Sequence, residues 1–207
     1  MNFLQKIPLF IFNLLYPSKI YGKENIPDGS AVFVCNHYSA LDCGFIAKAY
    51  NKDIYFLAKK ELFQKKFIAK LIKSYGGIPI NRENPDIKSL FLAVKVLKDG
   101  HKLTIFPEGT RNKTGTNKLL PIKGGTVVFA VKAKCPILPI MMSGKTRIFK
   151  KIRIIIGKPF TLEEFYDKKL TPELIDKMGQ IVYDKMFEQQ VLLEDIISNK
   201  KHKRKKQ

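Results

Sequence analysis

Short apolar runs that recur along the chain restrict its fold more than any other feature of this 207-residue sequence. β-branched and aromatic residues dominate the runs, and turn-forming Gly, Pro or Asp residues border several of them, a pattern typical of buried strands. Strands that alternate with helices indicate an α/β fold. We therefore predict a single domain with a mixed β-sheet flanked by helices. The expected strands are residues 31–34, 54–58, 102–106, 135–140 and 152–156, with a short edge strand at 19–22.

The predicted helices have recognisable start and stop signals. Asn84, Pro85 and Asp86 combine a capping side chain, a proline suited to the first turn and an acid near the positive end of the helix dipole. Gly100 marks the end of that helix, and Pro172 begins a long helix with apolar residues on one face. The expected helices are 43–50, 59–74, 84–99, 124–134 and the segment from 171 onward.

Composition divides the chain into segments but does not indicate a second domain. Residues 1–18 are apolar, residues 19–160 form the expected core, and residues 161–198 close the same domain with the long helix. Residues 199–207 form a basic tail that we expect to be disordered. A chain of this length can bury one sizeable core.

The net charge of +20 indicates that the partners are anionic. Phospholipid surfaces, phosphorylated substrates, acidic carrier proteins and nucleic acid all fit such a field, which does not choose among them. Cys35, Cys43 and Cys135 show no paired metal-ligand or redox spacing. Reduced thiols in a cytosolic setting are the expected state of these cysteines.

The N-terminal segment is the most apolar part of the chain, but it is too short to span a membrane. Residues 7–16 include Pro8 and Asn13 and reach only about half of the roughly 20 residues that a spanning helix needs. A small-residue cleavage site is lacking, which argues against a signal peptide. Two interpretations stay open for residues 1–18: a helix lying in the membrane interface, which the aromatic residues favour, or a helix packed on the domain.

His37 and Asp42 fall where the strand at 31–34 passes into the helix at 43–50. The carboxyl ends of strands are where sites are commonly built in such sheets. If His37 lies in the loop and Asp42 in the first helical turn, the carboxylate can hold one ring nitrogen and leave the other free to accept a proton. This pair can act as a general base on a hydroxyl that the substrate supplies. A nucleophilic Cys35 is the alternative, although a cysteine that ends an apolar strand more often packs in the core.

Two other strand ends carry charged side chains. An extended piece at residues 76–82 ends in Arg82, and the strand at 102–106 is followed by Pro107-Glu108-Gly109-Thr110-Arg111. The planar arginine fork suits phosphate, and a glycine between the acid and the arginine lets a ligand approach the backbone. Residues 144–146 resemble the end of a nucleotide P-loop, but Pro139 stands where the upstream glycine is required, so we predict no nucleotide site there.

Four short motifs follow one another along the chain. An Asn-His-x4-Asp element matches Asn36, His37 and Asp42, and Phe-Pro-Glu-Gly-Thr-Arg matches residues 106–111 without a change. A Gly-Ile-x-x-x-Arg-like element at 77–82 and a proline-containing apolar strand at 136–139 are weaker signals. Together, residues 21–159 resemble the 1-acylglycerol-3-phosphate acyltransferase (lysophosphatidic acid acyltransferase) family. Asn81 departs from the family pattern, in which an acid often precedes the arginine, and the N-terminal apolar segment is short for the family.

The resemblance implies a glycerol-3-phosphate acyltransferase-like fold and a reaction. A fatty acyl group would pass from an acyl thioester, on coenzyme A or acyl carrier protein, to the sn-2 hydroxyl of 1-acyl-glycerol-3-phosphate, giving phosphatidic acid. His37 would be the base and Asp42 would orient it, without an acyl-enzyme, a metal or a bound organic cofactor. The substrate-binding residues that the resemblance implies are Arg82, Glu108, Gly109, Thr110 and Arg111.

The resemblance also implies partners and a location. Lysophosphatidic acid, the acyl donor and an anionic membrane surface are the expected partners, with no specific nucleic acid, and a peripheral or monotopic position on the cytoplasmic face of the cell membrane is expected. Two alternatives stay open: the same chemistry on glycerol 3-phosphate or another lysophospholipid, and a non-enzymatic basic protein that binds membrane or nucleic acid. The recurrence of His, Asp, Glu and Arg at strand ends favours an enzyme.

Overall fold

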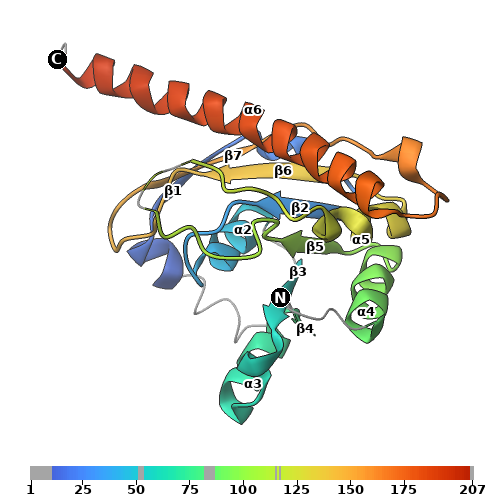
Figure 1. Ribbon diagram of the computed structural model, residues 1–207. Coiled ribbons are helices and arrows are strands. Elements are labelled where there is room, and N and C mark those ends of the chain that lie inside the picture. Colours follow the sequence, from blue (N-terminus) through green and yellow to red (C-terminus); the bar gives the residue numbers. More distant parts are fainter. Residues whose placement is uncertain (1–10, 51–53, 82–86, 115, 117, 206–207) are drawn as a thin grey trace.

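A mixed sheet forms the centre of the molecule and confirms the predicted α/β architecture (Figure 1). The computed structural model describes residues 11–50, 54–81, 87–114, 116 and 118–205. The described strands form one seven-stranded sheet in the order β1-β7-β6-β2-β5-β3-β4. β7 runs antiparallel to β6, whereas the other neighbouring strands are parallel. The strands are β1 (Ser18–Tyr21), β2 (Ala31–Cys35), β3 (Ile54–Lys59), β4 (Gly77–Ile80), β5 (Lys102–Ile105), β6 (Ile137–Met142) and β7 (Ile152–Ile156).

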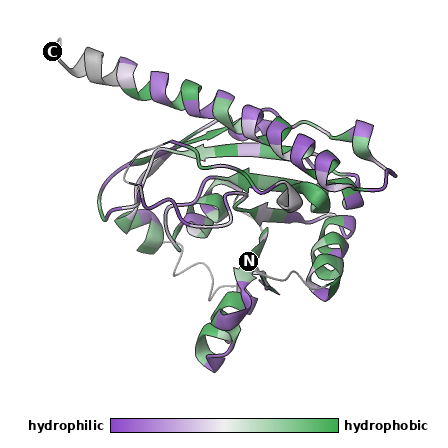
Figure 2. Cartoon of the chain, viewed as in Figure 1, coloured by the Kyte–Doolittle hydropathy of each residue, from purple (hydrophilic) through white to green (hydrophobic). Residues whose placement is uncertain are grey.

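Helices cover both faces of the sheet, which explains why its central strands are apolar on both sides. In β2, Val32 and Val34 face a core shared with α4, α5 and α6, while Phe33 and Cys35 face a second core shared with α2. Figure 2 shows apolar residues concentrated in the strands, whereas α6 alternates between hydrophilic and hydrophobic residues. The α-helices are α2 (Asp42–Tyr50), α3 (Lys66–Ser74), α4 (Ile87–Lys98), α5 (Val128–Ala133) and α6 (Pro172–Lys205), and the short 3-10 helices are η1 (Lys23–Asn25), η2 (Lys60–Phe63), η3 (Gly124–Val127) and η4 (Glu163–Phe165).

The N-terminal segment is helical at residues 11–15 and contacts the domain. The Phe12 ring lies 5.0 Å from that of Phe45 on α2, and Gly44 makes room for it, because a Cβ at that position would lie 2.9 Å from the Phe12 ring. Ile11 and Leu14 nevertheless stay exposed, at 49% and 65%. Among the described residues, no helix is both long enough and apolar enough to cross a membrane.

Two predicted helices differ from the structure in their bounds. The expected helix at 59–74 is divided, because Lys59 still pairs with Ile80 in the sheet and Lys65 is extended, so that α3 begins only at residue 66. The helix expected at 124–134 begins as the 3-10 helix η3, and only Val128–Ala133 is α-helical. The predicted capping residues 84–86 lie outside the described residues.

The basic tail is a third difference. We expected residues 199–207 to be disordered, but α6 continues to Lys205. Lys, Arg and Gln are good helix formers, and neither Gly nor Pro occurs after Gly179, so nothing in this stretch ends the helix earlier.

One edge of the sheet gathers most of the loops that matter for the site. Because β2, β3, β4, β5 and β6 are parallel, their carboxyl ends lie at the same edge. β7 runs in the opposite direction and β1 is parallel to β7, so both strands begin there. The loops after β2, β5 and β6, together with the N-terminal stretch before β1, therefore meet at this carboxyl edge.

Candidate active site

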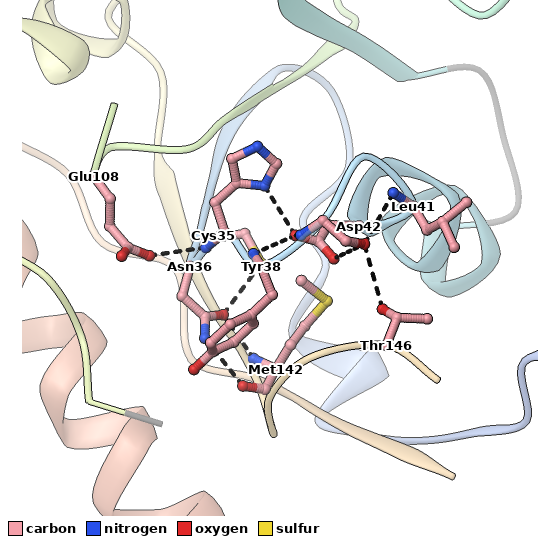
Figure 3. Close-up of polar contacts among 10 residues, drawn as sticks. Cys35, Asn36, Tyr38, Leu41, Asp42, Glu108, Met142 and Thr146 are labelled. Carbon is pink, nitrogen blue, oxygen red and sulfur yellow. Dashed lines mark hydrogen bonds and ion pairs between the residues drawn. The ribbon is translucent and has the colours of Figure 1, made fainter. Parts of the chain in front are cut away.

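His37 and Asp42 are in contact at the carboxyl end of β2 (Figure 3). His37 lies in the loop directly after the strand, and Asp42 is the first residue of α2, which is the arrangement that their spacing predicts. Nδ1 of His37 lies 2.9 Å from Oδ2 of Asp42, and both side chains are buried. The structure thus brings the pair together, and the chemical roles of the two residues stay predictions.

The turn between the two residues holds the Asp42 carboxylate in place. Its Oδ2 atom accepts the backbone N–H groups of Tyr38, at 2.6 Å, and Ser39, at 2.8 Å. Its Oδ1 atom accepts the Ser39 hydroxyl at 3.1 Å. An oxygen that already accepts two N–H groups is an acceptor toward His37 as well, so Nδ1 carries the ring proton. The other ring nitrogen, Nε2, is then the basic atom of His37.

The Asn36 side chain anchors the start of this turn to the neighbouring strand. Its Nδ2 donates to the Met142 carbonyl at 3.0 Å, and its Oδ1 accepts the Met142 N–H at 2.8 Å. The side chain therefore takes the place of a backbone partner just beyond the last paired residues of β2 and β6, Cys35 and Ile140. The motif identified Asn36 in the sequence, but this anchoring role depends on strand pairing that the sequence alone does not specify.

The loop after β5 holds His37 from the other side. β2 and β5 are neighbours, with Val34 opposite Ile105, so the residues that follow each strand lie next to each other. The Phe106 ring stacks on the His37 imidazole with centroids 4.0 Å apart and an angle of 18° between the planes. The Asn112 N–H donates to the His37 carbonyl at 2.6 Å. Stacking and hydrogen bonding together fix the orientation of the imidazole.

Glu108 supports the backbone of the turn. Its Oε1 accepts the His37 N–H at 2.8 Å, and the side chain is only 3% exposed. Burial raises the pKa of Glu108 to about 7, the negative charge of Asp42 adds to that rise, and the N–H groups of His37 and Leu120 oppose it. The structure shows one Glu108 oxygen bonded to the turn that holds His37. The role that the resemblance implies for Glu108, binding of the acceptor, stays a prediction.

The other predicted substrate-binding residues differ in their placement. Gly109 is in the left-handed conformation with φ of 68°, and a Cβ there would lie 3.1 Å from the Lys123 side chain. Thr110 and Arg111 follow it on the surface of the same loop. Arg82 lies outside the described residues. The structure therefore brings Glu108 and Gly109 to the His37 site and places Thr110 and Arg111 beside them, exposed.

A cysteine nucleophile finds little support at this site. Cys35 is fully buried, its thiol lies 3.6 Å from Asn36 Oδ1, and burial raises its pKa well above the ordinary value. A buried thiol of raised pKa is a poor nucleophile, which favours the packing interpretation. Within the part of the chain that the structure describes, no group of three or more His, Cys, Asp or Glu side chains is arranged to hold a metal ion.

Comparison with known proteins places the chain in a family. Residues 17–143 match a family model described as Acyltransferase, and this range includes both the His37 turn and residues 106–111. The chain belongs to this acyltransferase family. The family assignment predicted from the sequence motifs is thereby confirmed.

The relatives of this acyltransferase share one name. The chain is 37% identical over 156 residues to the 1-acyl-sn-glycerol-3-phosphate acyltransferase of Bacillus subtilis, a match that covers 71% of this chain and 75% of that protein. It is 33% identical over 153 residues to the protein of that name from Cocos nucifera, covering 72% of this chain but only 49% of the relative. The crystal structure of the 1-acyl-sn-glycerophosphate (LPA) acyltransferase PlsC from Thermotoga maritima is similar, with a TM-score of 0.64, 26% identity, and coverage of 91% of this chain and 83% of that one.

Proposed function

We propose that this acyltransferase transfers a fatty acyl group from an acyl thioester to the sn-2 hydroxyl of 1-acyl-glycerol-3-phosphate, forming phosphatidic acid. The names of its relatives support this acceptor. The observation that carries the proposal is the 2.9 Å contact between His37 Nδ1 and Asp42 Oδ2, which leaves His37 Nε2 as a base at the carboxyl edge of the sheet.

The proposed reaction is a direct transfer. His37 Nε2 removes the proton of the acceptor hydroxyl as the hydroxyl oxygen attacks the thioester carbonyl carbon. The new C–O bond forms, the C–S bond breaks, and the leaving thiolate takes the proton from the imidazolium. Asp42 stabilises the imidazolium while it exists, and general-base assistance of this kind accelerates a reaction by roughly 10²–10⁴-fold. The acceptor is itself the nucleophile, so no acyl-enzyme forms.

The two substrates would meet at the carboxyl edge. We assign the acceptor phosphate to Arg111 and Arg82, because a guanidinium binds phosphate through two parallel hydrogen bonds. Gly109 allows the phosphate to approach the backbone of the same loop. Glu108 acts as a positioning residue through its bond to the His37 N–H. The donor is an acyl thioester of coenzyme A or of acyl carrier protein, and the net charge of +20 suits the acidic character of either.

The acceptor is a membrane lipid, and we propose that the enzyme works as a peripheral protein on an anionic membrane surface. A basic protein is attracted to such a surface by about 1 kcal/mol for each Lys or Arg that lies close to it. The exposed apolar residues of the N-terminal stretch, Ile11 and Leu14, suit a shallow position at the interface.

Acyl transfer by His37→Ala tests the mechanism. Wild type and variant are supplied with 1-acyl-glycerol-3-phosphate in anionic vesicles and with coenzyme A and carrier-protein thioesters in separate reactions. We expect wild type to form phosphatidic acid and the variant to lose roughly 10²–10⁴-fold in rate. His101→Ala is the matched control, since His101 is exposed and precedes β5 at the opposite edge. Full activity in His37→Ala would refute the mechanism, and wild type inactive with both donors would refute the acceptor.

A further inference from the structure

The loop between β6 and β7 presents two apolar side chains to solvent at its tip. The Lys150 N–H donates to the Arg147 carbonyl at 3.1 Å and closes a tight turn, with Ile148 and Phe149 at its two central positions. These side chains are 57% and 72% exposed. The turn therefore places its largest apolar groups where they contribute least to the core of the domain.

The backbone of the turn makes this placement more unusual. Phe149 has φ of 57°, which lies in the left-handed region that a large side chain rarely adopts. Gly or Asn is the common choice for such a turn position. An exposed Phe in this conformation is unfavourable both for the backbone and for hydration, and at 72% exposure it gains little from packing. We take this as an indication that Phe149 contacts something outside the domain.

The charges around the tip indicate what that contact is. Residues 143–153 contain no acid, and the basic side chains that are exposed in this loop are Lys145, Arg147, Lys150 and Lys151. Apolar side chains surrounded by cations match an anionic lipid surface, where the apolar groups enter the acyl region and the cations bind phosphate groups.

The loop is continuous with the N-terminal stretch and with the site. The Phe149 N–H donates to the Leu15 carbonyl at 2.8 Å, so that the tip lies beside the exposed Ile11 and Leu14, and Figure 1 shows the two segments together at the left of the view. At the base of the loop, Thr146 Oγ1 lies 3.5 Å from the hydroxyl of Ser39, which bonds to Asp42. One surface thus joins the tip to the turn that holds the catalytic pair.

A second basic and apolar element follows β3, farther along the carboxyl edge. Phe67 and Leu71, one turn apart on α3, are 81% and 49% exposed. Lys66, Lys70 and Lys73 are exposed on the neighbouring side of the same helix. In the strand order, β2 and β5, which carry the site, stand between β6 and β3. His37 therefore lies between two parts of the edge with the same lipid-binding character.

We propose that residues 143–151 form a lipid-binding loop that inserts Ile148 and Phe149 into an anionic phospholipid surface and thereby holds the carboxyl edge, with His37, against the membrane. This inference deepens the proposed function, because it names the surface through which the enzyme reaches a lipid acceptor.

Insertion is measured directly with a tryptophan at the tip. The chain contains no Trp, so Phe149→Trp supplies the sole reporter and changes the strain at that position little. Phe187→Trp on α6, where Phe187 is 46% exposed, is the matched control. With phosphatidylglycerol vesicles, the emission of Phe149→Trp should move to shorter wavelength and be quenched by brominated acyl chains, whereas that of Phe187→Trp should not change.

A second pair of variants tests whether the tip is required. In Ile148→Gln/Phe149→Asn, Asn suits the left-handed backbone, so the fold is kept while the apolar groups are lost. Phe187→Gln/Val191→Gln removes two exposed apolar groups from α6 as the control. We expect the loop variant to partition into the vesicles at least roughly tenfold less than wild type, and the control to match wild type. Turnover of a monomeric short-chain acceptor should be unchanged in both.

The outcomes separate the two proposals, since neither binding measurement requires turnover. Wild type that fails to sediment with the vesicles, a Phe149→Trp emission that stays unchanged on bound protein, or a loop variant that partitions like wild type would each overturn the lipid-binding loop. So would an emission shift caused by acyl carrier protein but not by vesicles. Insertion of the tip by an enzyme that is inactive with all glycerolipid acceptors would overturn the proposed function alone.

Discussion

The Asp42 carboxylate accepts three hydrogen bonds through its Oδ2 atom, from His37 at 2.9 Å and from the N–H groups of Tyr38 at 2.6 Å and Ser39 at 2.8 Å. In Asp42→Asn the amide oxygen can still accept the two backbone N–H groups, so the turn should persist. The charge that stabilises the imidazolium in the proposed mechanism is lost, however, and we expect kcat to fall roughly 10²–10⁴-fold with a small change in melting temperature. Asp99→Asn, which removes an exposed partner of Lys95, is the control and should stay active.

Glu108 makes the stability of the enzyme depend on pH in a distinctive direction. Its pKa is raised from an ordinary value of 4.5 to about 7, so the folded state binds its proton more tightly than the unfolded state does. The stabilisation from the protonated form is complete below about pH 4.5 and is lost as the pH rises toward about 7. One group contributes a slope of at most about 1.4 kcal/mol per pH unit.

Thermal melts between pH 4.5 and 7 test this assignment in wild type and Glu108→Gln. The amide can accept the His37 N–H but cannot titrate, so we expect the variant to lose stability less steeply than wild type as the pH rises. Measuring kcat against pH for the same two proteins shows whether the charge of Glu108 affects the function of the turn that holds His37. Identical slopes in the two proteins would exclude Glu108 as the titrating group.

Contacts between neighbours in sequence could be predicted at this scale, and contacts across the sheet could not. His37 and Asp42 belong to one turn, so their spacing, together with the expected strand before them and helix after them, indicated that they can meet. Glu108 is 71 residues from His37, and Met142 is 106 residues from Asn36. Their contacts depend on which strands are neighbours and on the pairing register. For that reason the sequence identified Glu108 as a candidate site residue but did not predict its bond to the backbone of the His37 turn.

Among the elements, the contact between α6 and η3 connects the long helix to the site. A Cβ on Gly124 would clash with the Ile175 carbonyl oxygen, and one on Gly179 would lie 2.9 Å from the Gly124 Cα. The neighbouring Lys123 donates its N–H to the Pro107 carbonyl at 3.0 Å, in the loop that contacts His37. The sequence predicted that Gly124 opens a helix, but the need for a glycine there comes from the close approach of α6, which is a tertiary contact.

Gly124→Ala should therefore destabilise the enzyme. The added methyl group meets backbone atoms of Ile175, which cannot move aside as a side chain can, so α6 or η3 must shift. We expect the free energy of unfolding to fall by about 1–3 kcal/mol, with a decrease in melting temperature of roughly 2–4 °C for each kcal/mol. Gly125→Ala is an adjacent control, because a Cβ there meets nothing within 4 Å. Equal melting temperatures for the two variants would contradict the proposed close contact.

For the whole molecule, the strand order decides what the carboxyl edge can do. Parallel pairing brings the loops after β2, β5 and β6 to one edge, and the reversed β7 with its partner β1 brings the N-terminal stretch to the same place. The sequence indicated which segments are strands and which residues follow them. It did not indicate that β5 lies beside β2 while β3 and β4 form the far side of the sheet, since that order requires pairing between distant segments. The contact between His37 and Asp42 was therefore predictable, whereas its position between two apolar and basic elements was not.

The basic C-terminal segment affects the whole molecule, because the electric field of its six cations acts at a distance. Removal of residues 199–207 deletes the end of α6 and should leave the His37 site unchanged, so turnover of a monomeric acceptor should match wild type. Partition into anionic vesicles should fall at low salt, where each nearby cation contributes about 1 kcal/mol, and should equal that of wild type at high salt, where the field is screened. The loop variant should show the opposite pattern. Its partition should stay below that of wild type at high salt, because insertion of apolar side chains persists there. Partition of the truncated enzyme, the loop variant and wild type across a salt series measures both contributions, and a truncated enzyme that loses turnover of the monomeric acceptor would show that α6 beyond Ser198 supports the site.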